Sequence, residues 1–165
     1  MIKDVEMLDR MRCIVKLYDR LSAKVCEKWK INRTEMDVLA FLNNHPDFDT
    51  ARDIVEIRML PKANVSLAVE SLIQKGYLAR RIDEKDRRRV HLSITEGACR
   101  IVGDIEEMQN YERDVRMRGF SEREQKQYGR MMERICENAK AELERLQRSS
   151  GEAKAGRARQ EGEKG

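Results

Sequence analysis

The sequence predicts a mainly helical protein in which three short helices and a β-hairpin lie between long helices. Apolar residues recur every three or four positions over most of the chain, as on one face of an α-helix. Only 5% of the residues are aromatic and only 2 are prolines, which also fits a helical chain. Between residues 78 and 94 the apolar spacing changes to every second position, which is typical of strands. Three helices followed by a hairpin is the order of a winged helix-turn-helix.

A long helix is expected at the N-terminus. From Leu8 to Trp29 the apolar residues form one helical stripe, and a second row runs beside it through Ile14, Leu17 and Leu21. One stripe is enough to pack a helix on a core, so the second row indicates another surface, such as a partner subunit. We therefore assign residues 1–30 to an N-terminal dimerisation helix.

Three short helices are predicted next. Thr34 with Asp37, and then Thr50 with Asp53, have the spacing of capping boxes at helix N-termini. A third helix spans residues 61–76, with a proline in its first turn and a glycine at its end. Together with the hairpin, these helices make up the winged helix-turn-helix region that we assign to residues 31–97 and call the reader.

Long helices return after the hairpin. Two apolar stripes separated by Gly119 occupy residues 98–148, and Ser121 with Glu124 has the spacing of a cap for the second helix. We assign this region to C-terminal dimerisation helices. Residues 149–165 include four glycines and no large apolar side chain, so we expect a disordered tail.

Basic residues are concentrated around the hairpin. Residues 50–95 contain ten basic and six acidic residues, so their net charge of +4 equals that of the whole chain. The loop DEKDRRR has the length of a wing whose cations enter a minor groove or contact phosphates. The candidate DNA contacts in this loop are Lys85, Arg87, Arg88 and Arg89, with Asp86 fixing the loop by accepting hydrogen bonds.

The third short helix can supply the major-groove contacts. Its inward face is expected to hold Val65, Ala68, Val69, Leu72 and Ile73. Its outward side chains are mostly small, so the helix can approach base edges closely. The candidate contacts are Asn64 and Ser66 to bases or phosphates, Leu67 to a thymine methyl group, and Lys62 to a phosphate.

The stretch NVSLAVESLIQKGYLARRIDEKDRRRVHLSITEGA resembles the MarR family of bacterial regulators. It is similar to that family in its recognition helix, in the junction from Leu72 to Gly76, and in the wing signature of Asp86 and Arg88. The resemblance extends over roughly residues 8–147. It implies a homodimer that binds a pseudo-palindromic double-stranded DNA operator, commonly as a repressor, and that a small ligand or thiol oxidation releases.

Two departures from the family pattern stand out. Leu67 stands where many members carry a polar or basic DNA-contacting residue, which leaves the operator sequence open. The glycine that usually follows the second wing strand is Ala98 here, with Gly97 one position earlier.

A ligand pocket is expected where the long first and fifth helices meet the reader. Its candidate lining residues are Met11, Tyr18, Trp29 and Met108, although each also fits a core or dimer contact. Cys13 precedes Leu17 and Tyr18 as the reactive cysteine does in the family's peroxide sensors, but lies one residue farther from the tyrosine. A shift of one position rotates a side chain by about 100° around the helix axis. We therefore favour an incidental cysteine and keep a redox-responsive regulator that uses Cys13 as an alternative.

Other classes of function have less support. The four cysteines and two histidines have no metal-ligand spacing, and there is neither a nucleophile–base pair nor a phosphate-binding glycine loop. We therefore predict a chain that is not an enzyme and that needs no cofactor. With no secretory signal and no apolar run of membrane-spanning length, a cytoplasmic location is expected. The remaining alternative is a winged-helix module that binds an acidic protein instead of DNA.

Overall fold

The computed structural model describes residues 4–162 of the chain. It has the predicted winged helix-turn-helix architecture and divides into two compact units, Met1–Arg116 and Met117–Gly165. The first unit contains α1 (Asp4–Trp29), α2 (Arg33–Asn44), α3 (Ala51–Arg58), α4 (Lys62–Gln74), β1 (Leu78–Ile82), β2 (Val90–Ile94), the 3-10 turn η1 (Glu96–Ala98) and α5 (Cys99–Arg116). The second unit contains α6 (Glu122–Gly162).

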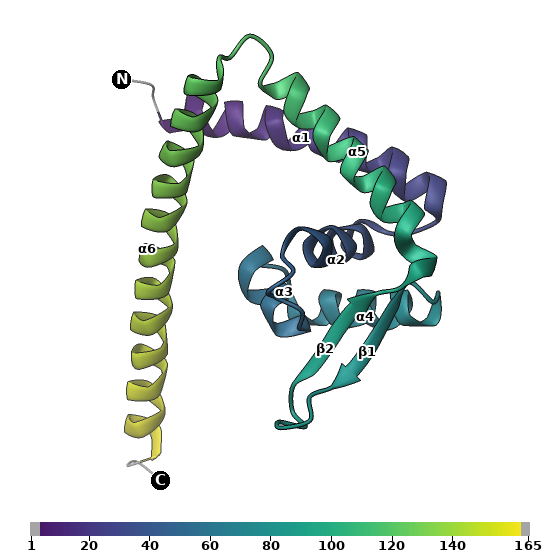
Figure 1. The fold of residues 1–165 in the computed structure, drawn as a ribbon. Helices are drawn as coiled ribbons and strands as arrows, with labels where there is room; N and C mark the ends of the chain where they lie inside the picture. Colours follow the sequence, from purple (N-terminus) through teal and green to yellow (C-terminus); the bar gives the residue numbers. More distant parts are fainter. Residues whose placement is uncertain (1–3, 163–165) are drawn as a thin grey trace. The chain divides into compact units, whose positions relative to one another are not determined.

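Helices α1 and α5 lie side by side above the reader (Figure 1). The C-terminal half of α1 packs inward through Ser22 and Val25, and α5 through Ile101 and Ile105. The N-terminal half of the predicted α1 stripe is different, because its large apolar side chains are exposed. They are Val5, Met7, Leu8, Met11, Ile14 and Val15.

The N-cap of helix α2 lies two residues earlier than predicted. Asn32, not Thr34, is the N-cap, and it forms a capping box with Glu35: the Asn32 side chain accepts from the Glu35 N–H, and the Glu35 carboxylate accepts from the Asn32 N–H at 2.7 Å. Asn is at least as good an N-cap as Thr, and Glu completes the box better than Asp37 could. Glu35 also binds Lys75 Nζ at 2.8 Å, so the start of α2 is tied to the end of α4.

Helices α3 and α4 begin and end close to where the sequence places them. Thr50 and Asp53 form the predicted capping box at the start of α3. Helix α4 follows Pro61 and ends at Gln74, and two residues later Gly76 has a left-handed φ of +75°. The N–H groups of Gly76 and Tyr77 donate to the carbonyls of Ile73 and Leu72, which closes the helix and turns the chain into β1.

The core of the first unit surrounds α2. Residues 35–42 of this helix are all buried, because neighbouring elements cover it on every side. The largest fully buried apolar side chains are Phe41, Met36, Leu39, Ile54, Leu72, Ile101 and Ile105.

The second unit is one long helix. Ser121 caps α6 with Glu124 as predicted, since the Ser121 N–H donates to the Glu124 carboxylate at 2.8 Å. Tyr128 and Met132 are half-buried, and Met131, Ile135, Leu143 and Leu146 are exposed.

The chain after residue 148 differs from the expected disorder. Helix α6 continues to Gly162, while residues 163–165 lie outside the described residues. Ala, Glu, Lys, Arg and Gln are good helix formers, and extending an existing helix needs no new nucleation step. High helix propensity and the absence of a nucleation cost therefore favour the helix despite the glycines. Among residues 4–162, no helix combines the length and apolar character needed to cross a bilayer.

The capping assignment of α2 leads to a first prediction. Replacing Asn32 by Ala should lower the free energy of unfolding by about 1 kcal/mol, because the Glu35 N–H loses its acceptor. The matched change Thr34→Ala should have an effect below about 0.5 kcal/mol, because Thr34 lies inside the helix. Urea denaturation followed by circular dichroism measures both. A larger loss for Thr34→Ala would contradict the assignment.

Candidate nucleic-acid interface

The outward face of α4 carries the four side chains that the sequence assigns to DNA. Lys62, Asn64, Ser66 and Leu67 are all exposed. The opposite face is fixed in the core by Val65, Ala68, Val69 and Leu72. Because one face is buried and the other open, α4 has a single orientation in which these four residues point away from the core.

The hairpin projects from the same unit as a wing (Figure 1). Strands β1 and β2 pair antiparallel, with Leu78 opposite Ile94 and Ile82 opposite Val90. Leu78 and Leu92 are buried at the inner end, and the rest of β1 is exposed. The apolar base therefore holds the hairpin on the core while its tip extends outward.

Hydrogen bonds within the wing loop fix its shape. The Asp83 carboxylate accepts from the backbone N–H groups of Lys85 and Asp86, each at 2.8 Å. The Asp86 carboxylate accepts from the Arg88 N–H at 3.0 Å, which is the loop-fixing role expected for Asp86. The Asp83 N–H donates to the Arg89 carbonyl at 3.0 Å. Asp83 thus organises most of the loop, a role that was not predicted.

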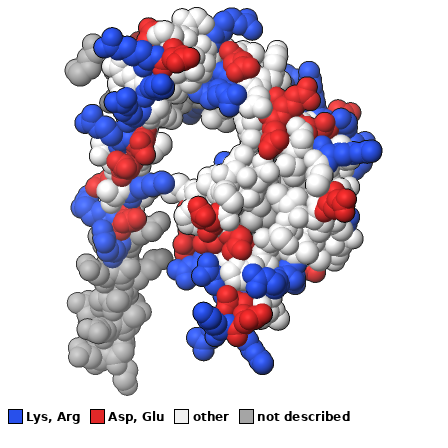
Figure 2. Space-filling view, viewed as in Figure 1, with Lys and Arg blue, Asp and Glu red and all other residues white. Residues whose placement is uncertain are grey.

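The loop presents four cations to solvent. Lys85, Arg87, Arg88 and Arg89 are exposed, and within residues 4–162 their side chains form no ion pair. Figure 2 shows Lys and Arg gathered on the outside of the wing tip, around a smaller acidic group. The Asp83 and Asp86 carboxylates bind backbone N–H groups, and the four cations remain available to an anionic partner.

His91 anchors the wing to the body of the reader. Its Nδ1 lies 2.8 Å from the Asp49 carboxylate before α3, and its Nε2 lies 3.0 Å from Asp83 in the wing loop. Hydrogen bonds that the His91 ring donates to the Asp83 and Asp49 carboxylates raise the pKa of His91 and so favour its imidazolium form. The same contact with His91, with two backbone N–H groups, lowers the pKa of Asp83 to about 2. Next to this contact, the Leu92 N–H donates to the Asp49 carbonyl at 2.7 Å.

A second contact joins the wing to α4 directly. Arg80 on β1 binds the Glu70 carboxylate at 2.6 Å. Glu70 lies on the exposed side of α4, where an unpaired carboxylate would repel phosphate. The ion pair offsets that charge and links the two elements of the interface.

The predicted ligand residues do not meet in one cavity. Met11 and Trp29 are eighteen positions apart on α1, which at 1.5 Å per residue is about 27 Å. Trp29 donates its Nε1 proton to Asp104 and so joins α1 to α5. Met108 is buried beside a cavity of about 420 Å³. Tyr18 borders a different cavity.

That second cavity is lined by arginines. It has a volume of about 540 Å³ and lies among α1, α5 and the ends of α2 and α3. Its lining residues are Ile14, Val15, Tyr18, Arg33, Arg58, Gln109, Glu112, Arg113 and Arg116. An apolar and aromatic wall beside several guanidinium groups is suited to a small anion with an apolar body.

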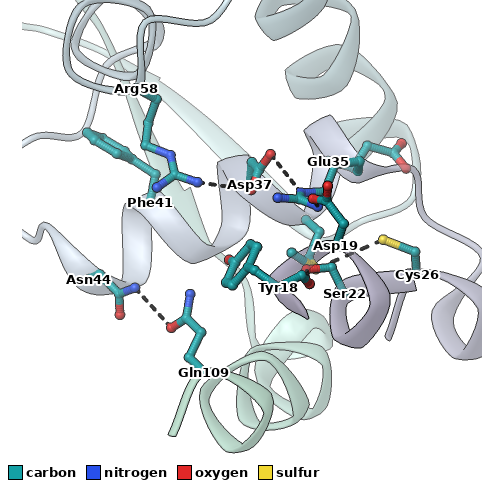
Figure 3. A network of polar contacts seen from close by, with 12 residues as sticks. Tyr18, Asp19, Ser22, Cys26, Glu35, Asp37, Phe41, Asn44, Arg58 and Gln109 are labelled. Atoms are coloured by element: carbon teal, nitrogen blue, oxygen red, sulfur yellow. Dashed lines mark hydrogen bonds and ion pairs between the residues drawn. The ribbon is translucent and has the colours of Figure 1, made fainter. Parts of the chain in front are cut away.

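A polar network connects this cavity to the reader (Figure 3). The Asp37 carboxylate, almost buried on α2, accepts from Arg33 at 3.1 Å and from Arg58 at 3.0 Å. Arg33 also binds Asp19 on α1 at 2.7 Å and lies over the Tyr18 ring, 4.8 Å from its centroid. Two of the cavity arginines therefore hold α1, α2 and α3 together.

All four cysteines are free thiols. Cys13 is exposed on α1, while its neighbour Arg12 pairs with Asp9 at 3.4 Å. Cys26 is half-buried, and this burial raises the pKa of its thiol. Among residues 4–162, no group of three His, Cys, Asp or Glu side chains has the arrangement of a metal site.

Comparisons with known proteins agree with the geometry. A family model described as "MarR family" matches residues 29–89. The chain is similar to the HTH-type transcriptional regulator PecS of Dickeya dadantii (strain 3937), at 33% identity over 122 residues, which are 72% of this chain and 73% of PecS.

Solved structures share the fold. A MepR–DNA complex of S. aureus matches with a TM-score of 0.68 and 17% identity, over 83% of this chain and 96% of MepR. BpsR of Bordetella bronchiseptica, described as having its DNA binding regulated by 6-hydroxynicotinic acid, matches with a TM-score of 0.63 and 18% identity. That match covers 81% of this chain and 99% of BpsR.

The His91 contacts predict a pH dependence. Because the pKa of His91 is raised on folding, its contribution to stability is complete below about pH 6.5 and is lost as the pH rises through the higher folded value. The free energy of unfolding of the wild type should therefore fall toward that of His91→Gln as the pH rises from about 6.5 through the raised pKa of His91. Urea titrations of both proteins measure this difference, and parallel pH profiles would contradict it.

Proposed function

The chain belongs to the MarR family of DNA-binding transcriptional regulators, and from this premise we propose that it is a homodimeric repressor that a small carboxylate ligand releases from its operator. The observation that carries the proposal is the wing, whose four exposed cations stand on a hairpin fixed to the same unit as α4. Such a pair of elements can engage a major groove and the neighbouring phosphates or minor groove together.

The two elements have different roles in this proposal. Lys85, Arg87, Arg88 and Arg89 contact phosphates or a minor groove, which gives affinity that depends strongly on salt. The exposed face of α4, with Asn64, Ser66 and Leu67, reads base edges. Lys62, at the first position of α4, contacts a phosphate. The DNA complex of the similar protein MepR supports DNA over an acidic protein as the partner.

Exposed apolar surfaces support the homodimer. The N-terminal half of α1 carries six exposed large apolar residues, and α6 separately exposes Met131, Ile135, Leu143 and Leu146. Apolar stripes of this length on a helix need a covering partner, and a second copy offers the same surfaces in return. A dimer would place two readers about 34 Å apart, one turn of the duplex, on a pseudo-palindromic operator.

The arginine-lined cavity supports release by a carboxylate. A bound carboxylate would compete with Asp37 for Arg33 and Arg58, and these arginines connect α1, α2 and α3. Loosening α3 from α2 would move the support of α4 and change the distance between its groove contacts and the wing. The similarity to BpsR, whose effector is an aromatic carboxylic acid, points to the same chemical class. A thiol switch at the exposed Cys13 is kept as the alternative trigger.

The wing assignment predicts a change in salt dependence. Arg88→Ala should weaken binding to any duplex and reduce the slope of log K against log salt by about 0.9 for each phosphate that the variant no longer neutralises. Fluorescence anisotropy with a labelled duplex of random sequence, about three helical turns long, measures the slope. Arg12→Ala removes the same charge from the exposed part of α1 and should leave the slope unchanged. An unchanged slope in Arg88→Ala would count against the wing.

The cavity assignment predicts selective loss of ligand binding. Benzoate, nicotinate and 6-hydroxynicotinate should be tested for raising the melting temperature of the wild type, as a ligand that binds the folded state does. Arg113→Gln should reduce the shift, because Arg113 lines the cavity while its own ion pair, with Asp114 at 3.8 Å, is long and exposed.

Arg100→Gln is the matched control for this experiment. Arg100 lies exposed on the same helix and does not line the cavity, so this variant should keep the full shift. Equal losses in both variants would show that the carboxylates act elsewhere.

A further inference from the structure

Leu67 is the most exposed large apolar side chain in the described part of the reader. It is 71% exposed at the centre of the outward face of α4, whereas Val65 and Ala68 on the inward face are buried. The side chain therefore contributes little to packing within the unit. On the face that is proposed to meet DNA, such a group is free to contact an apolar feature of a base pair.

The surroundings of Leu67 allow close approach to a groove. Ala63 and Ser66 beside it are small, and Glu70, one turn later, is held by Arg80 at 2.6 Å. Lys62 is the one basic residue of α4, and it stands at the first position. No guanidinium group of α4 is thus placed at the centre of this face to bind the O6 and N7 atoms of guanine, the commonest specific contact in a major groove.

We infer that Leu67 determines operator specificity by contacting the C5-methyl group of a thymine, so that each half-site has a required T·A pair under the centre of α4. The thymine methyl group is the one apolar feature that a natural base pair presents in the major groove. This inference rests on the proposed function, in which α4 enters that groove.

Asn64 supports the same assignment. It lies three positions before Leu67, so both side chains project from one side of α4 in adjacent turns. An asparagine amide can donate to N7 and accept from the N6 amino group of adenine. Leu67 and Asn64 together therefore favour A·T pairs over G·C pairs where α4 meets the bases.

The experiment begins with a selected operator. Wild-type protein is used to enrich duplexes from a random library, and each thymine of the enriched sequence is then replaced in turn by deoxyuridine, which lacks only the methyl group. At one position in each half-site, binding should weaken about fourfold, the effect of removing one methyl group from an apolar interface. Leu67→Ala should bind the parent duplex more weakly and show no further weakening at that position.

Two further variants sharpen the result. Leu67→Met keeps an apolar side chain and should keep the sensitivity to deoxyuridine. Leu67→Arg should instead select guanine at the same position, because a guanidinium group binds its O6 and N7 atoms. All three substitutions are at an exposed position, and unchanged melting temperatures would show that the fold is intact.

The outcomes separate this inference from the proposed function. If no duplex is enriched, the operator-binding function fails. If an operator is enriched but no single methyl group matters, or if Leu67→Ala remains as sensitive as the wild type, the function stands and the role of Leu67 is wrong. The latter result would also be expected if Leu67 contacted a protein partner.

Discussion

The burial of α2 is the constraint on which the reader depends. All residues from 35 to 42 are buried, and two of them, Glu35 and Asp37, are carboxylates. A buried carboxylate is costly unless charged donors satisfy it, so each must bind cations from neighbouring elements. Glu35 binds Lys75 just after α4, and hydrogen bonds from Lys75 and the Asn32 backbone lower its pKa although burial opposes this. Asp37 binds Arg58 at the end of α3 and Arg33. The positions of α3 and α4 are thus constrained by the ion pairs that the two buried carboxylates of α2 require.

The features that the sequence predicts correctly are those encoded locally. The capping box of Thr50 and Asp53 needs residues three positions apart, and the end of α4 needs a glycine able to adopt positive φ at position 76. The apolar spacing between residues 78 and 94 likewise indicates a hairpin, and the structure pairs its strands with Leu78 opposite Ile94. Exposure of Lys62, Asn64, Ser66 and Leu67 follows in the same way from the helical period, because the apolar face fixes which side chains must point outward.

The features that the sequence does not predict depend on distant partners. Asn32 and Thr34 are both acceptable N-caps. Which of them caps α2 depends on Glu35, whose carboxylate also accepts a hydrogen bond from Lys75, forty positions away. His91 resembles an ordinary strand residue, and its partner Asp49 is 42 positions away. The cavity arginines come from three helices and share no periodicity, so no pattern in the sequence groups them with Tyr18, the predicted ligand residue that lines the same cavity. The sequence did contain one signal for the contact between His91 and Asp83: a histidine directly before the strand residue Leu92, with an acidic residue at the start of the wing loop.

The internal order of the wing loop has a consequence for the speed of recognition. Because Asp83 and Asp86 already hold the backbone around the arginines, the loop has little left to fold when it meets a duplex. Contacts made by an ordered segment lose less entropy than those of a segment that must first fold. In the proposed DNA complex, capture of a duplex then requires no slow rearrangement of the wing, and the rate of encounter would be set by long-range attraction between its cations and the phosphates.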